Sequence, residues 1–167
     1  NGFTGGECYL PLGSLANRQG RGIGNVLGGM DDSFESAVAA SCLKVFDVNV
    51  AAAGITADAA KAAGIDTGQV WGTFSDSAHY WPDSEIVKAK LVFDRKSRRI
   101  LGVQALGKGD ALRIIDAAVP YIAGHRNIDD LKEVEHCYAP PYSQALSPLH
   151  YLGFAAMAEL DEGVVQF

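Results

Sequence analysis

The sequence predicts an α+β fold in which helices pack on a mostly antiparallel sheet. Two features lead to this prediction. Residues 85–107 hold two stretches of alternating apolar and polar residues around a short basic segment, which is typical of an antiparallel hairpin. Further along the chain, apolar residues recur at helical spacing. We therefore expect one helix, then the sheet, then three more helices.

The first expected element is a helix from Ser14 to about Leu27. Four of its apolar side chains could share a broad face: Leu15, Ile23, Val26 and Leu27. Ser14 is a suitable N-cap because its hydroxyl can accept a hydrogen bond from a backbone N–H of the first turn. Gly28 and Gly29 follow the last apolar position and mark the end of the helix, because glycine readily adopts the backbone conformation found there.

The sheet is expected to begin with two short extended stretches, residues 40–47 and 48–54. A compact helix follows, with Thr56 as its N-cap and Gly64 as its stop. Residues 68–77 then form a further strand.

The hairpin of residues 85–94 and 99–107 is the strongest part of the predicted sheet, with its turn in the segment RKSR. Its inward-facing side chains are expected to be Val87, Ala89, Leu91 and Phe93 of the first strand and Leu101, Val103 and Ala105 of the second.

Three helices are expected after the hairpin. Residues 109–125 form the clearest one, and a shorter helix begins at Asn127. The last covers residues 146–160, with Pro148 in its first turn, where a proline is tolerated. The apolar face of the first of these helices is expected to contain Leu112, Ile115, Val119 and Ile122.

The composition is that of a globular chain with an excess of acidic residues. Hydrophobic residues make up 48% of the 167 residues, and the net charge is -6. An acidic chain without a basic stripe argues against nucleic acid as a partner. No apolar run approaches the roughly 20 residues that cross a bilayer, so no membrane partner is expected either.

The cysteines predict neither disulfides nor a metal site. Cys8, Cys42 and Cys137 are widely separated, and none forms a C-x-x-C pair or a Cys/His pair with the spacing of zinc ligands. Reduced thiols of this kind predict a cytoplasmic protein.

The glycine-rich segment Gly22–Gly28, GIGNVLG, is similar to a dinucleotide-binding fingerprint. Such a fingerprint requires a buried strand directly before it. Here polar, helix-prone residues precede it, so we favour close packing of this helix over a pyrophosphate cradle.

The segment EHCYAPPYS, residues 135–143, holds the main candidate site residues. Cys137 can be read as a nucleophile, but free cysteine is commonly a small apolar filler, and we favour that interpretation. The two prolines stiffen the backbone after Tyr138 and would hold its phenol in place for catalysis. Simple packing of this tyrosine is an equally good interpretation at this stage.

A second aromatic cluster lies at His79–Trp81. It can form a hydrophobic plug at a sheet end, part of a subunit interface, or the wall of a ligand site. His79 and His136 are candidate acid–base groups, although no second residue is visibly arranged to orient either imidazole.

Several phrases occur in a specific order: LPLGSLANRQGRGIGNVLGG, KVFDVNVAAAGIT, HYWP, KLVFDRKSRRILGVQALG, RIIDAAVPYIAG, IDDL and YAPPYSQALSPL. The series covers nearly the whole chain. It resembles the carboxy-terminal part of FAD-dependent pyridine nucleotide-disulfide oxidoreductases. The His-Pro-Thr motif of the glutathione reductase branch is missing, and YAPP resembles the single-cysteine branch of NADH oxidases, NADH peroxidases and coenzyme A disulfide reductases.

The resemblance implies a division of the chain into three parts. Residues 1–30 would be the end of the FAD-binding domain, residues 31–150 the dimerisation domain, and residues 151–167 a C-terminal helix with a possible linker to a further module. Within the first part, the beginning of the final helix would approach the pyrimidine edge of the flavin. The matching positions are Ser14, Leu15 and Ala16.

The resemblance also implies catalytic positions. In coenzyme A disulfide reductases, two tyrosines of the dimerisation domain reach the partner subunit's cysteine–coenzyme A site. Tyr80 in HYWP and Tyr138 in YAPPYS match those positions. The phrase around Tyr80 departs from the usual one because Trp81 stands where a second tyrosine is common.

The function implied is that of a part of a larger homodimeric flavoenzyme of redox homeostasis. The parent would use FAD and NADH or NADPH to reduce a disulfide, persulfide, peroxide or oxygen, with the substrate, such as coenzyme A disulfide or a persulfide, shared between subunits. The FAD fingerprint, the NAD(P)H domain and the redox cysteine are absent from these residues, so the fragment alone is expected to bind no cofactor and to be inactive. The alternative is a free-standing α+β interaction or ligand-binding module without redox activity.

Overall fold

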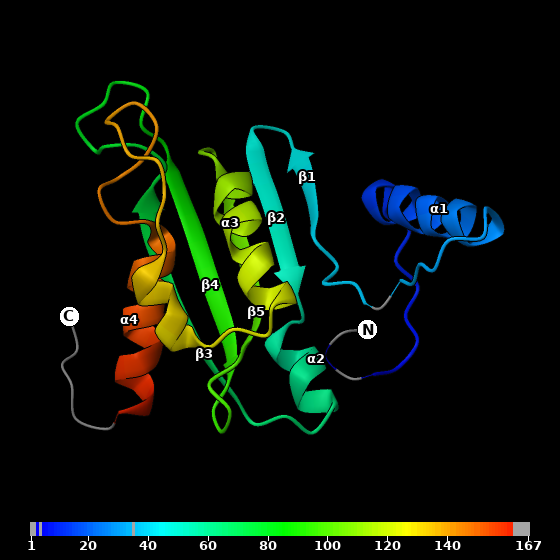
Figure 1. Ribbon diagram of the computed structural model, residues 1–167. Coiled ribbons are helices and arrows are strands. Elements are labelled where there is room, and N and C mark those ends of the chain that lie inside the picture. The colour runs from blue at the N-terminus through cyan, green and yellow to red at the C-terminus, as the bar shows by residue number, and fades with distance from the viewer. Residues whose placement is uncertain (1–2, 4, 35, 162–167) are drawn as a thin grey trace.

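The computed structural model describes residues 3, 5–34 and 36–161 (Figure 1). The elements in chain order are α1 (Gly13–Leu27), β1 (Ser41–Val45), β2 (Val48–Gly54), α2 (Ala57–Ala62), β3 (Thr67–Ser75), β4 (Ile86–Asp94), β5 (Ile100–Gly107), α3 (Ala111–Ala123), the 3₁₀ helix η1 (Ile128–Glu133) and α4 (Pro148–Leu160). The predicted α+β class is confirmed. The short helix expected after Asn127 is a 3₁₀ helix.

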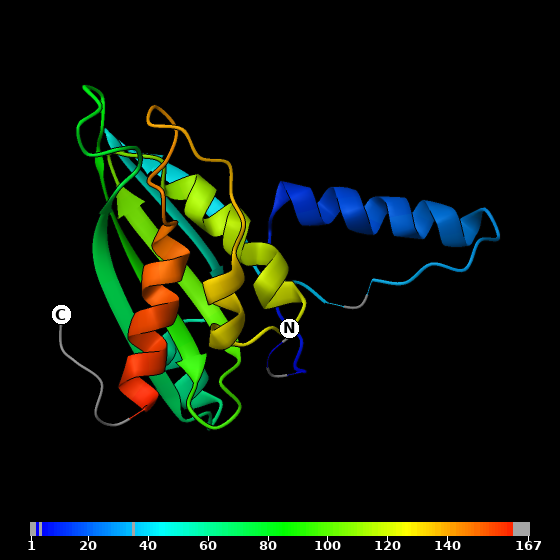
Figure 2. The same cartoon turned by 60° about the vertical axis from the view of Figure 1, so that its left-hand side comes forward.

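The five strands form one sheet in the order β1-β2-β5-β4-β3, and every neighbouring pair is antiparallel. Figure 2 shows that α3, η1 and α4 cover one face of this sheet. No described helix combines the length and the apolar character needed to cross a bilayer.

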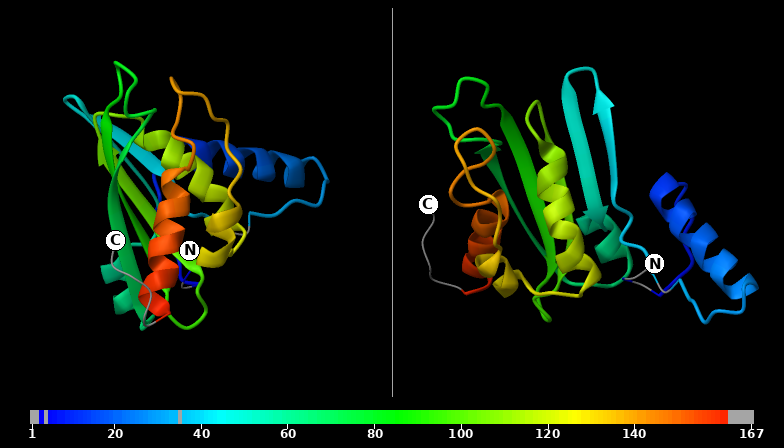
Figure 3. Two further views of the ribbon diagram at one scale, coloured as in Figure 1. Left: turned by 90° about the vertical axis from the view of Figure 1, so that its left-hand side faces the viewer. Right: turned by 45° about the horizontal axis from the view of Figure 1, so that its top comes forward.

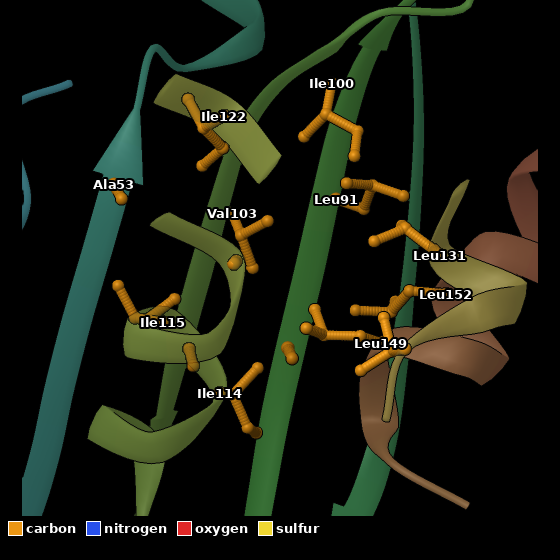
Figure 4. Close-up of a cluster of buried hydrophobic side chains, with 14 of the residues drawn as sticks. Ala53, Leu91, Ile100, Val103, Ile114, Ile115, Ile122, Leu131, Leu149 and Leu152 are labelled. Carbon is orange, nitrogen blue, oxygen red and sulfur yellow. The ribbon is translucent and has the colours of Figure 1, made fainter. Parts of the chain in front are cut away.

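The main core lies between this covered face and the three helices (Figure 4). In this core Val103 of β5 lies beside Ile115 and Ile122 of α3 (Figure 4). Leu91 of β4 lies beside Leu131 of η1 and Leu152 of α4. All four inward positions predicted for β4 are at most 2% exposed. Full burial of one leucine or phenylalanine side chain contributes about 1.5–3 kcal/mol, so this layer is the main source of stability.

The prediction for Leu101 is wrong because β5 contains an irregularity. Val92 lies opposite Gly102, but Phe93 lies opposite Ile100, so Leu101 is an extra residue on β5. Such a bulge turns the side chain to the other face of the sheet. There Leu101 is buried with Val92 and with Ala60 of α2.

Two further predictions need correction. Leu112 is 39% exposed, because α3 turns a different face to the sheet. The buried residues of this helix are Ala111, Ile114, Ile115, Ala118 and Ile122. At α1, the N-cap is Leu12, without a side-chain hydrogen bond, and Ser14 lies inside the first turn. The expected cap of α2 is confirmed, since the hydroxyl of Thr56 accepts a hydrogen bond from the N–H of Ala59 at 3.2 Å.

Helix α1 differs from the other described helices because none of its residues is buried. It extends away from the sheet beyond β1 (Figures 1 and 2). At the other end of the chain, the division proposed at residue 150 falls within α4, and the predicted linker to a further module falls largely on residues 162–167, outside the described residues.

Candidate functional site

Two loops lie side by side at the end of the sheet where β3 finishes and β4 starts (Figures 1 and 3). We call residues 76–85 the Tyr80 loop and residues 135–147 the Tyr138 loop. The side-chain amide of Gln144 donates a hydrogen bond to the carbonyl of Ser75 at 2.9 Å, across 69 sequence positions. The N–H of Ala78 donates to the carbonyl of Pro140 at 3.0 Å. These two bonds fasten the loops together.

The Tyr138 loop is also closed on itself. The Nε2–H of His136 donates to the carbonyl of Gln144 at 2.9 Å, and the hydroxyl of Ser143 donates to the carbonyl of Cys137 at 2.9 Å. The N–H of Ser143 also donates to the carbonyl of Ala139, at 3.1 Å. The backbone on both sides of Tyr138 is therefore fixed by hydrogen bonds as well as by the two prolines.

A cavity of about 410 Å³ lies between the Tyr138 loop and the first turns of α3. Tyr138 lines it together with Cys137 and Tyr142. Tyr138 is 53% exposed, so a residue that lines the cavity is also open to solvent. A phenol in this position can donate a hydrogen bond to a molecule that enters the cavity.

The charged groups of the cavity wall are already engaged within the protein. The carboxylate of Asp110 caps α3 by accepting from the N–H of Arg113 at 3.1 Å, and it also forms an ion pair with that guanidinium at 3.6 Å. The carboxylate of Asp76 accepts from the N–H of Asp110 at 3.1 Å. The phenols of Tyr138 and Tyr142 and the Cys137 thiol are thus the better candidates to contact a ligand.

Tyr80 lies on the neighbouring loop and is 64% exposed. Its ring meets the ring of His79 edge-on, with centroids 5.4 Å apart. The residues that line the cavity do not include Tyr80. The structure therefore brings both predicted tyrosines to one end of the sheet but gives only Tyr138 a place in the wall of the cavity.

The two candidate acid–base histidines have different surroundings. His136 uses Nε2 to close the Tyr138 loop, and its ring lies 5.8 Å from the ring of His150. His150 is buried, and its Nδ1 accepts a hydrogen bond from the N–H of Ser147 at 3.0 Å. His79 is exposed beside Tyr80. His136 thus has a structural role in this loop.

The predicted flavin contacts lie at the start of α1. The N–H of Ala16 donates to the carbonyl of Leu12 at 3.0 Å. The N–H groups of Ser14 and Leu15 come before this bond, in the part of a helix where a carbonyl or an anion can accept from them. Ser14 and Leu15 therefore fit a flavin carbonyl better than Ala16, whose N–H is already engaged.

The start of α1 and the Tyr138 loop lie on opposite sides of α3 (Figure 1). Ser14 lines a small hollow with Leu112 and Asp116, whereas the cavity of Tyr138 contacts Arg113 and Ala117. Within a single chain, the structure does not bring the predicted flavin contacts and the predicted catalytic tyrosines together.

Sequence reasoning missed Gln144 and Asp76, which hold these loops in place. The segment YAPPYSQ draws attention to its aromatic residues and prolines, and the hydrogen-bond partner of Gln144 lies on a distant strand. Within residues 3, 5–34 and 36–161, no group of three or more His, Cys, Asp or Glu residues is placed to hold a metal ion.

Comparison with known proteins identifies the family. The family model for the dimerisation domain of pyridine nucleotide-disulphide oxidoreductases matches residues 40–149, well over half of the chain. The chain belongs to this family. A dimerisation domain implies assembly of subunits, and the matched residues include both the Tyr80 loop and the Tyr138 loop.

Individual relatives agree with this assignment. The NAD(P)H sulfur oxidoreductase (CoA-dependent) of Pyrococcus furiosus is 29% identical over 147 residues, which cover 88% of this chain and 33% of that protein. The coenzyme A disulfide reductase of Staphylococcus epidermidis is 29% identical over 152 residues, which cover 89% of this chain and 34% of that protein. Among solved structures, an NAD-dependent persulfide reductase from A. fulgidus matches with a TM-score of 0.93 and 36% identity, over 96% of this chain and 30% of that one. The chain thus spans about a third of the length of these relatives.

Proposed function

We propose that this chain is the dimerisation part of a homodimeric FAD-dependent reductase and that it supplies Tyr138 to the active site of the partner subunit. The observation that supports this proposal best is the position of Tyr138, which lines a cavity of about 410 Å³ from a loop closed by hydrogen bonds. The similarity to reductases named for coenzyme A disulfide, persulfide and sulfur supports a sulfur substrate, with coenzyme A disulfide or a persulfide favoured over peroxide or oxygen.

In this proposal each part of the chain has a distinct role. When bound to the parent protein, FAD would supply the redox chemistry that links NADH or NADPH to the sulfur substrate. The N–H groups of Ser14 and Leu15 hold a flavin carbonyl. Tyr138 donates a hydrogen bond from its O–H to the thiolate that leaves when the sulfur–sulfur bond is broken. Tyr80 reaches the same site from the neighbouring loop.

The proposal also concerns how the chain is organised and where the protein works. Residues 1–30 would complete the FAD-binding domain, residues 31–150 would form the dimerisation domain, and the parent enzyme would work in the cytoplasm. Helix α1 supports a larger parent over a free-standing module. Its apolar side chains Ile23 and Leu27 are 62% and 83% exposed, which is costly for a helix without a neighbour.

The substitution Tyr138→Phe in the full-length protein tests the proposed role. We expect turnover of the sulfur substrate to fall by about 10²-fold, since that is what loss of a proton donor usually costs. Stopped-flow reduction of the flavin by NADH should stay unchanged. Tyr151→Phe is a matched control, because Tyr151 is a half-exposed tyrosine stacked on Phe74 outside the cavity. Equal turnover in Tyr138→Phe and in the parent would remove the catalytic role of Tyr138.

A further inference from the structure

The tip of the β1–β2 hairpin carries an unusual residue. Val45 pairs with Val48, so Phe46 and Asp47 form a two-residue turn. Phe46 has a φ of 54°, in the left-handed region, and its side chain is 95% exposed. A glycine is favoured at such a position, because a bulky side chain there strains the backbone. In this chain alone, Phe46 is therefore unfavourable in conformation and in exposure.

The tip is nevertheless held firmly in place. The carboxylate of Asp47 forms an ion pair with the Nζ of Lys108 at 2.8 Å. The side-chain amide of Asn49 donates to the carbonyls of Lys108 and Gly109, both at 3.0 Å. These contacts fix the hairpin tip to the corner between β5 and α3, so the ring of Phe46 is presented on a preorganised turn.

This corner connects Phe46 to the candidate site. Gly109 is followed by Asp110, the N-cap of α3, and Asp110 and Arg113 line the cavity of Tyr138. The hairpin tip, the start of α3 and both tyrosine loops lie at the same end of the sheet (Figures 1 and 3). In the proposed function, this end of the domain faces the partner subunit.

We infer that Phe46 is an anchor of the subunit interface, where its ring is buried against the second copy of the full-length protein. This inference rests on the proposed function. Three observations favour a second copy as the partner. The family is defined by dimerisation, and the tip lies at the same end of the sheet as the Tyr138 loop (Figures 1 and 3). Phe46 is also a preorganised aromatic residue of the type that dominates interface energetics. Burial against the partner would offset the strain at φ.

The substitution Phe46→Gly separates the backbone strain from the contact made by the ring, because glycine relieves the strain at φ while it removes the ring. In the full-length protein, we expect exchange of subunits between two differently labelled dimers, followed by fluorescence energy transfer, to become at least about tenfold faster. Phe46→Asn should behave in the same way, since asparagine tolerates a left-handed backbone. The control is Trp71→Ala in the middle of β3, where a 75% exposed aromatic side chain is removed outside the hairpin tip.

Unchanged exchange in both Phe46 variants would overturn the inference. A lower unfolding temperature with unchanged exchange would also overturn it, because the ring would then pack within its own subunit. Either result leaves the role of Tyr138 open to its own test, since turnover of Tyr138→Phe does not depend on Phe46. If Tyr138→Phe leaves turnover unchanged while Phe46→Gly speeds subunit exchange, the proposed role of Tyr138 is rejected. Phe46 is then still supported as an anchor of the interface.

Discussion

Helix α1 and helix α3 were both expected from apolar residues at helical spacing, but only α3 buries its apolar side chains. Ile115 and Ile122 of α3 are at most 2% exposed against the sheet, whereas no residue of α1 is buried. Periodicity therefore predicts that a helix has an apolar face, but not that the same chain covers it. Because the chain spans about a third of its relatives, we propose that the parent protein covers α1.

The largest expected effect comes from truncating one apolar side chain in the core that α3 covers and one in α1. Leu91→Ala removes a fully buried side chain from the sheet and should lower the free energy of unfolding of this chain by about 2–5 kcal/mol. Ile23→Ala in α1 should change it by less than about 0.5 kcal/mol. Urea denaturation measures both. Similar losses at the two sites would mean that α1 is part of the same core.

The second prediction concerns how the Tyr138 loop is positioned. Gln144→Glu replaces the amide that donates to the carbonyl of Ser75 by a carboxylate, which that carbonyl repels. Turnover of the full-length enzyme should fall about tenfold with flavin reduction unchanged, since a small displacement of a catalytic group is costly. Gln69→Glu, at an exposed position of β3, is the control.

A double-mutant cycle distinguishes positioning of Tyr138 from a general loss of stability. If Gln144 acts through Tyr138, then Gln144→Glu should add little once Tyr138→Phe is present. Fully additive effects on turnover would show that the loop bond and the phenol act independently.

A smaller effect on stability than that of Leu91→Ala should come from the turn between β4 and β5. The Arg98 guanidinium donates two hydrogen bonds of 2.7 Å to Asp129 and holds the pKa of that carboxyl below its ordinary value of 3.8. The stabilisation is therefore present above pH 3.8 and is lost as the pH falls through the lowered pKa. Because Asp129 is 45% exposed, Asp129→Asn should cost only about 0.5–1 kcal/mol near pH 7. Urea denaturation at several pH values should show this difference shrinking to zero in strong acid, and a constant difference would contradict the ion pair as its cause.

At Cys137 we expect no effect at all on turnover. Its thiol is exposed beside Tyr138, and a self-contained cysteine enzyme would depend on it. Cys137→Ser in the full-length protein should keep the turnover of the parent within a factor of about two, whereas a loss comparable to that of Tyr138→Phe would restore the nucleophile hypothesis.

Local signals in the sequence were sufficient for much of the fold. The alternation in β4 and the cap at Thr56 depend on neighbouring residues, and both were predicted correctly. The orientation of the Leu101 side chain was predicted wrongly, because it depends on a register shift of β5 against β4. The bond of Gln144 to Ser75 and the strained turn at Phe46 likewise depend on how distant strands and loops meet. The tyrosine positions came from the resemblance to a family, and their roles stay predictions.

The most direct test asks whether Tyr138 works on its own subunit or on the partner. Two inactive or impaired full-length variants are mixed under conditions of subunit exchange: Tyr138→Phe, and a variant without the redox cysteine that the family resemblance places outside this chain. If the site is shared, random assortment restores about a quarter of the sites, each with a phenol from one subunit and a cysteine from the other. We expect turnover to rise to that level. Turnover that stays at the average of the two separate variants would contradict a shared site.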